Sequence, residues 1–117
     1  MINRTALLLR YKRPAVQWIN DADPNPDGPA LSIEDVNEER LVYLIREEDA
    51  YSSDHLEKWL RQNFKALFEN ELHGWYQDPS LWPKLLTYQL FQRWFDVECH
   101  SMIVDTVGGL IEDDETE

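Results

Sequence analysis

Three prolines and a glycine stand within six residues of this chain, in the segment PNPDGP at positions 24–29. Proline lacks the backbone N–H that a helix or an inner strand needs, and glycine favours turns. No helix or strand can therefore run through this segment, so the elements on either side of it are separate.

The residues before this segment predict one strand and one helix. Residues 5–12 (TALLLRYK) are rich in leucine and are soon followed by a proline, which favours a strand that ends there. Proline is well tolerated in the first turn of a helix. Apolar residues then recur at positions 15, 18, 19 and 22, and this helical spacing predicts a helix with one apolar face.

The rest of the chain alternates between helical and strand patterns. Residues that favour helix ends are Ser32 with Asp35, Asp54 with Glu57, Gly74 and Pro83. The predicted elements are helices at 33–39, 55–73 and 83–95 and strands at 40–46 and 97–106. The order β-α-α-β-α-α-β predicts an α+β fold with a small three-stranded sheet, antiparallel or mixed, and helices packed mainly on one face. We expect residues 1–109 to form a single globular domain and residues 110–117 to be a disordered acidic tail.

The net charge of −12 is distributed unevenly along the chain. Residues 1–20 carry +4, residues 21–57 carry −10, and the last seven residues carry −5. Because such a surface repels phosphate backbones, nucleic acid is excluded as a partner. The charge instead favours a basic protein partner, or self-association through the basic stripe Lys58, Arg61 and Lys65 on the long helix.

The chain shows no targeting or cofactor motif. No apolar run approaches the roughly 18 to 20 residues of a membrane span, and the leucine triplet near the N-terminus is too short for a signal peptide. The lone Cys99 cannot form an internal disulfide, and we therefore predict a cytoplasmic protein. Cys99 itself is expected in the core, on the same strand face as Val97. The four glycines match neither a P-loop nor a dinucleotide fingerprint, and we predict no cofactor.

Asp96, Glu98 and His100 alternate along the last predicted strand and therefore share one face. They are candidates for a metal site or for general acid–base catalysis in a small hydrolase or isomerase. The alternative is structural: bases on the other two strands, among them Lys12 and Arg40, can pair with these acids across the sheet.

Residues 23–34 resemble the calcium loop of an EF-hand. The resemblance implies side-chain ligands at Asp23, Asn25, Asp27 and Glu34. The loop departs from the pattern where Pro26 and Leu31 replace the residues that such loops favour. Divalent-cation binding here is an alternative to an ordinary turn.

An aromatic loop and an acidic helix are the candidate partner-binding features. The loop contributes Trp75, Tyr76 and Trp82, which either cap the edge of the core or form a groove for a partner. The short helix carries like-charged pairs at i,i+4, namely Glu34 with Glu38 and Asp35 with Glu39. Such pairs repel each other and would be relieved by a nearby cation, including one from a basic partner.

The segments RYKRPAVQWIN, LVYLIREEDA and RWFDVECHS are spread over nearly the full length of the chain. Through them the chain resembles a family of small, acidic bacterial proteins to which no activity is attached. The resemblance implies one intact domain and transfers no functional residues. The leading hypothesis from the sequence is therefore a non-enzymatic protein-interaction or regulatory module.

Overall fold

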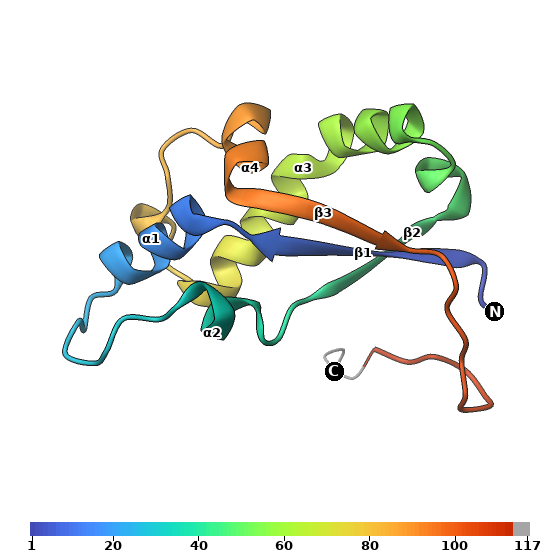
Figure 1. The fold of residues 1–117 in the computed structure, drawn as a ribbon, viewed down its shortest axis with the longest axis horizontal. Helices are drawn as coiled ribbons and strands as arrows, with labels where there is room; N and C mark the ends of the chain where they lie inside the picture. The colour runs from blue at the N-terminus through green and yellow to red at the C-terminus, as the bar shows by residue number, and fades with distance from the viewer. Residues whose placement is uncertain (114–117) are drawn as a thin grey trace.

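The structure, a computed structural model, describes residues 1–113 and has an α+β fold (Figure 1). Its strands are β1 (Arg4–Tyr11), β2 (Val42–Arg46) and β3 (Phe95–His100). Its helices are α1 (Arg13–Ala22), α2 (Ile33–Asn37), α3 (Ser53–Trp75) and α4 (Tyr88–Trp94), with short 3₁₀ turns η1 (Glu47–Ala50) and η2 (Pro79–Leu81). The predicted fold class is confirmed.

The three strands form one sheet in the order β2-β1-β3. Both pairings are antiparallel, with Leu7 opposite Tyr43 on one side and Cys99 on the other. The sequence left antiparallel and mixed pairing open, and the structure is antiparallel. β1 is the central strand, with a neighbour along each edge. This position agrees with its leucine-rich composition, because a central strand is more buried than an edge strand.

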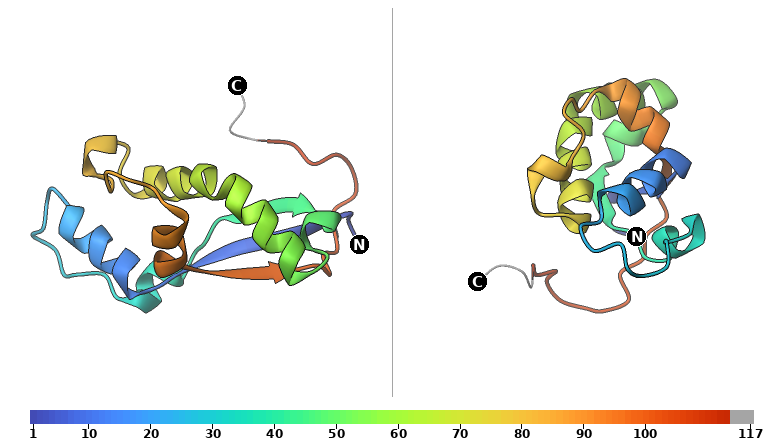
Figure 2. Two further views of the ribbon diagram at one scale, coloured as in Figure 1. Left: turned by 90° about the horizontal axis from the view of Figure 1, so that it is seen from above. Right: turned by 90° about the vertical axis from the view of Figure 1, so that its left-hand side faces the viewer.

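The core lies where alternate residues of β1 meet the helices. Leu7, Leu9 and Tyr11 are buried in one cluster with Phe68 of α3 and Phe91 of α4. Figure 2 shows α3 running along the sheet; α4 packs against both α3 and α1. Each fully buried leucine or phenylalanine contributes about 1.5–3 kcal/mol through the removal of apolar surface from water.

The long helix α3 extends beyond the predicted range of 55–73 at both ends. Ser52 rather than Asp54 caps its N-terminus, because the Ser52 hydroxyl accepts the His55 N–H at 3.2 Å. At the other end the helix continues through Gly74 to Trp75. The Trp75 indole N–H donates to the Tyr11 hydroxyl at 3.0 Å, and this contact holds the last turn against β1.

The predicted boundaries of the last helix and the last strand were wrong. Pro83 does not open a helix; α4 begins at Tyr88, after Thr87, whose hydroxyl accepts the Leu90 N–H at 3.1 Å. β3 starts directly at Phe95 and ends at His100, so residues 101–106 are not strand. The last pair of β3 with β1 is His100 opposite Ala6, and beyond it a backbone hydrogen bond, from the Ile2 N–H to the Ile103 carbonyl at 2.9 Å, joins the two segments.

Cys99 is exposed, which corrects the expectation that it belongs to the core. It lies on the same side of the sheet as the half-buried Val97, two residues along. The core cluster includes Val97 as a packed neighbour but not Cys99, so the helical cover ends between the two residues.

Residues 101–113 contain no helix or strand. The predicted acidic tail at 110–117 lies partly outside the described residues, at 114–117. None of the helices within residues 1–113 combines the length and the apolar character that crossing a membrane requires.

Candidate functional site

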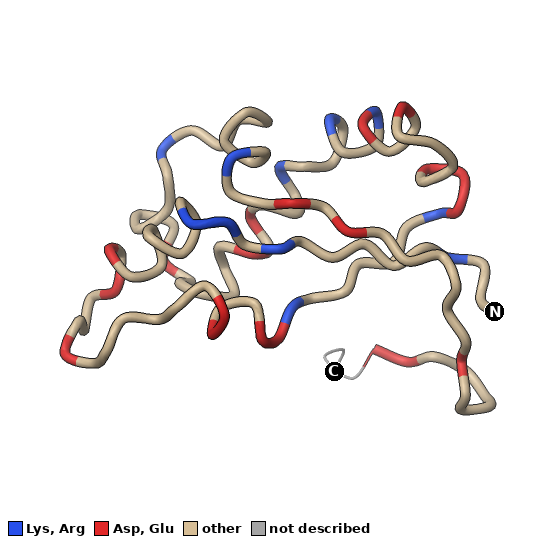
Figure 3. The backbone as a smooth tube through the Cα atoms, in the orientation of Figure 1, with Lys and Arg blue, Asp and Glu red and all other residues tan. Residues whose placement is uncertain are grey.

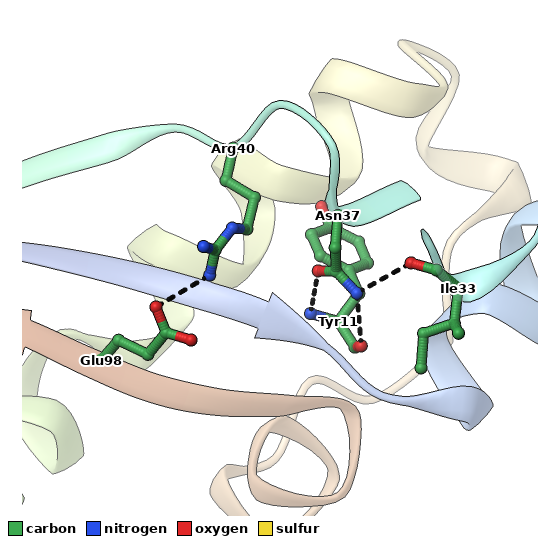
Figure 4. Close-up of polar contacts among 5 residues, drawn as sticks. All are labelled: Tyr11, Ile33, Asn37, Arg40 and Glu98. Atoms are coloured by element: carbon green, nitrogen blue, oxygen red, sulfur yellow. Dashed lines mark hydrogen bonds and ion pairs between the residues drawn. The ribbon is translucent and has the colours of Figure 1, made fainter. Parts of the chain in front are cut away.

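The short helix α2 is tied to the end of β1 by one side chain, Asn37 (Figure 4). Its Oδ1 accepts the Tyr11 N–H at 2.8 Å, and its Nδ2 donates to the Tyr11 carbonyl and to the Ile33 carbonyl, each at 3.0 Å. The pairing of β1 with β2 ends at Leu8, so β2 does not reach Tyr11. The Asn37 amide takes the place of a strand partner there and bonds both the N–H and the carbonyl of Tyr11. This contact fixes α2 beside the last turn of α3.

The helix held in this way is strongly acidic (Figure 3). Ser32 and Asp35 form a capping box, in which Asp35 accepts the Ser32 N–H at 3.0 Å. That hydrogen bond and the Ser32 hydroxyl hold the pKa of Asp35 below its usual value. Glu38 and Glu39 are exposed and form no ion pair with any residue in the range 1–113.

A buried carboxylate, Glu71, lies beneath this helix. Only 6% of its surface is exposed, and each of its oxygens accepts a tyrosine hydroxyl. Tyr11 donates to Oε1 at 2.7 Å, and Tyr43 donates to Oε2. The hydroxyl oxygens of these tyrosines in turn accept the Trp75 indole N–H at 3.0 Å and the Asn70 amide at 3.1 Å. The network therefore joins β1, β2 and the C-terminal half of α3.

Burial raises the pKa of Glu71 above its ordinary value, and the two tyrosine hydroxyls offset part of that shift. Burial and the neighbouring carboxylate also raise the pKa of Tyr11 and of Tyr43 far above the normal range. Both tyrosines therefore stay protonated and act as donors. The cluster is thus a carboxyl group shielded from water, whose two oxygens are held by tyrosine donors.

Two hollows meet at Trp75. One, of about 390 Å³, is lined by Asp35, Val36, Glu38, Glu39 and Trp75. The other, of about 240 Å³, shares Val36, Glu39 and Trp75 and extends to Tyr11, Glu71 and Arg40. We call this combined feature the Trp75 groove. One wall comes from α2 and the two glutamates that follow it, and the other comes from Trp75 at the end of α3.

The structure separates the predicted partner-binding residues into three places. Trp75, Asp35, Glu38 and Glu39 come together in the Trp75 groove. Glu34 lines a different hollow, with Arg13 and Asn20 of α1.

Tyr76 and Trp82 pack at the edge of the core instead. The Tyr76 hydroxyl donates to the Ile19 carbonyl, and the Trp82 indole donates to the Tyr76 carbonyl at 2.7 Å. Trp18 lies edge-on to Tyr76, with ring centroids 5.4 Å apart. These contacts hold α1 against the loop after α3, which is the structural alternative that the sequence offered for both residues.

Two of the three catalytic candidates on β3 are paired with bases. Asp96 lies 3.6 Å from the Lys12 ammonium, and Glu98 lies 3.0 Å from the Arg40 guanidinium, which reaches across β1 (Figure 4). These contacts confirm the pairing of acids and bases across the sheet. His100 is exposed at the end of the strand. Neither hollow of the Trp75 groove includes any of the three.

The calcium candidates do not form a cluster. Asp23 accepts the Asn25 N–H at 2.8 Å in a local turn, and Asn25, Asp27 and Glu34 are exposed. Among residues 1–113, no three Asp, Glu, His or Cys side chains lie close enough together to hold one metal ion. Asp23, Asp27 and Glu34 are therefore not gathered around a common point.

The sequence reasoning missed the Glu71 cluster. A signal was present, because Glu71 falls three and four residues after the apolar Phe68 and Leu67, and hence on the buried stripe of its helix. A carboxylate on an apolar stripe must find donors, and tyrosines on the core face of neighbouring strands are the natural ones.

Comparisons with models of protein families, with curated proteins and with solved structures give no match for this chain. The resemblance to small acidic bacterial proteins therefore stays a prediction.

Proposed function

We propose that this protein is a non-enzymatic interaction module that binds a basic segment of a protein partner in the Trp75 groove. The observation that carries the proposal is the meeting of Trp75 with the exposed carboxylates of Glu38 and Glu39 in one hollow. A guanidinium or ammonium group can lie against the indole face while it pairs with a carboxylate.

The charges around the groove favour a cationic ligand. Within residues 1–113, Arg40 is the one base that lines the groove, and it already pairs with Glu98 at 3.0 Å. Glu39 is therefore left without a cation of its own within residues 1–113. Beneath it, the Glu71 carboxylate adds negative potential at the floor of the smaller hollow.

The net charge of −12 also disfavours nucleic acid as the partner. We place the protein in the cytoplasm, because its single cysteine cannot form an internal disulfide. We also propose that the helices pack mainly on one face of the sheet. This arrangement would leave the Trp75 groove at one end of the layer of helices.

A peptide titration tests the proposal directly. Hexa-arginine and hexa-lysine peptides are added to the ¹⁵N-labelled protein, and the indole N–H signals and the amides of residues 35–39 are followed by NMR. We expect the Trp75 indole signal and the α2 amides to shift together and to saturate. Hexaglutamate should cause no shift.

A matched pair of variants separates the groove from general charge attraction. The double variant E38Q/E39Q removes two charges from the groove, and E47Q/E48Q removes two from η1. We expect the first to weaken peptide binding roughly two- to thirtyfold and the second to change it little. Equal weakening by both variants, or shifts that avoid Trp75, would contradict the proposal.

A further inference from the structure

The two edges of the sheet differ in how well they are protected. We call the face of the sheet that points away from the core residues Leu7 and Leu9 its open face. On this face β3, at one edge of the sheet, carries charged or polar side chains, namely Asp96, Glu98 and His100. β2, at the other edge, presents Val42 and Leu44 on that face, with 56% and 49% of their surface exposed. Charged side chains on an edge strand discourage pairing with another chain, and β2 has none between Arg40 and Arg46.

The outer backbone of β2 is available for pairing. Within the described residues 1–113, no backbone hydrogen bond reaches the side of β2 that faces away from β1. Leu41, at the start of this segment, is also 49% exposed. An exposed, apolar row of unpaired N–H and C=O groups is a template for another strand.

The order of residues along this edge identifies the strand that fits it. The segment RLVYLIR, residues 40–46, has the same pattern of residue types in both directions around Tyr43, with an arginine at each end and aliphatic residues between. In an antiparallel pair with a two-fold axis at Tyr43, Val42 of one copy faces the partner's Leu44, and Leu41 faces the partner's Ile45. Each apolar side chain then meets an apolar side chain of similar size.

We propose that β2 pairs with β2 of a second copy of this chain, so that two three-stranded sheets join into one of six strands. The two-fold axis is perpendicular to the sheet, so the open faces of both copies lie on the same side. Val42 and Leu44 of both copies then form one apolar patch across the junction. This register places Arg40 opposite the partner's Arg46, and the two positive charges repel each other. The repulsion is reduced because Arg40 already pairs with Glu98.

Sedimentation equilibrium on the full chain tests this pairing, at protein concentrations from about 1 to 500 µM, because a short edge interface is expected to be weak. The variant Leu44→Lys places a charge on the edge, and His100→Lys is its matched control. Both residues are exposed, and both lie directly opposite Ala6, one on each edge of the sheet. We expect a dimer whose Kd rises at least about tenfold in Leu44→Lys and stays unchanged in His100→Lys.

Disulfide crosslinking checks the register independently of that variant. In a Cys99→Ser background, Val42→Cys and Leu44→Cys are prepared as separate proteins. Pairing about Tyr43 places residue 42 opposite residue 44, so a mixture of the two should crosslink far faster than either alone. A wild-type chain that is monomeric throughout, a dimer that Leu44→Lys leaves intact, or equal crosslinking in all three samples would overturn the proposal.

Discussion

At the scale of single residues, the buried Glu71 contributes to how the stability of the molecule depends on pH. Burial raises the folded-state pKa of this carboxyl above its unfolded value of about 4.3. The folded state therefore holds the proton more tightly, and stability is lost as the pH rises from about 4 through the raised pKa.

The variant Glu71→Gln removes this titration while it keeps an acceptor for one tyrosine. We expect the free energy of unfolding of the variant, relative to the wild type, to improve steadily as the pH rises from about 4 to 7. Urea unfolding at several pH values measures the difference. A difference that does not change with pH would show that Glu71 titrates normally in the folded state.

The hydroxyl of Tyr11 bonds both Glu71 and Trp75. Its removal should therefore lower the free energy of unfolding by more than the loss of one surface hydrogen bond. Tyr11→Phe leaves Glu71 Oε1 and the Trp75 indole N–H without their shared contact. We expect a destabilisation of about 1–3 kcal/mol in urea unfolding, because unsatisfied buried polar groups are costly. Tyr43→Phe is the comparison, and it should cost less because Tyr43 is only half-buried.

At the scale of elements, the contact of Asn37 with β1 decides where the acidic helix α2 lies. Asn37→Asp keeps the acceptor for the Tyr11 N–H but loses both amide donor bonds and turns a carboxylate toward two carbonyls. We expect a loss of about 1–3 kcal/mol and faster hydrogen exchange of the α2 amides. Asn63→Asp is the control, since among the described residues the Asn63 amide donates one hydrogen bond, to the Trp59 carbonyl.

The seven-residue helix α4 depends on its N-cap, Thr87. A helix this short gains little from propagation, so the hydrogen bond from the Leu90 N–H to the Thr87 hydroxyl contributes to its local stability beside the packing of Phe91 and Trp94. Thr87→Ala should destabilise the protein by about 0.5–2 kcal/mol in thermal or urea unfolding. An unchanged stability would mean that the packing of Phe91 and Trp94 alone holds this helix.

The elements also show what the sequence can and cannot predict. Periodicity and β-branched or leucine-rich runs predicted all three strands and the α+β class, because alternation reports burial directly. Two helix ends were predicted at the wrong residue. Pro83 was expected to begin the last helix, but the helix begins after the cap Thr87. Gly74 was expected to end α3, but the helix continues to Trp75, which contacts β1. The groove was predicted only as separate residues, since Trp75 meets Glu38 and Glu39 through the tertiary contact of Asn37 with β1.

At the scale of the whole molecule, the two proposed interactions should respond to salt in opposite directions. Peptide binding in the Trp75 groove brings opposite charges together, so screening weakens it. Pairing of two β2 edges brings together two chains that each carry a net charge of −12, so screening relieves their repulsion. The Debye length falls from about 10 Å at 0.1 M salt to about 3 Å at 1 M.

The comparison is made on one protein sample with both measurements at each salt concentration. Between 0.05 and 0.5 M sodium chloride, as rough limits, we expect the Kd for hexa-arginine to rise by about tenfold and the dimer Kd to fall. A dimer that dissociates as salt is added would instead point to the basic stripe Lys58, Arg61 and Lys65 docking on an acidic surface. Leu44→Lys then distinguishes the two outcomes, because it disrupts pairing at β2 and leaves the basic stripe on α3 unchanged.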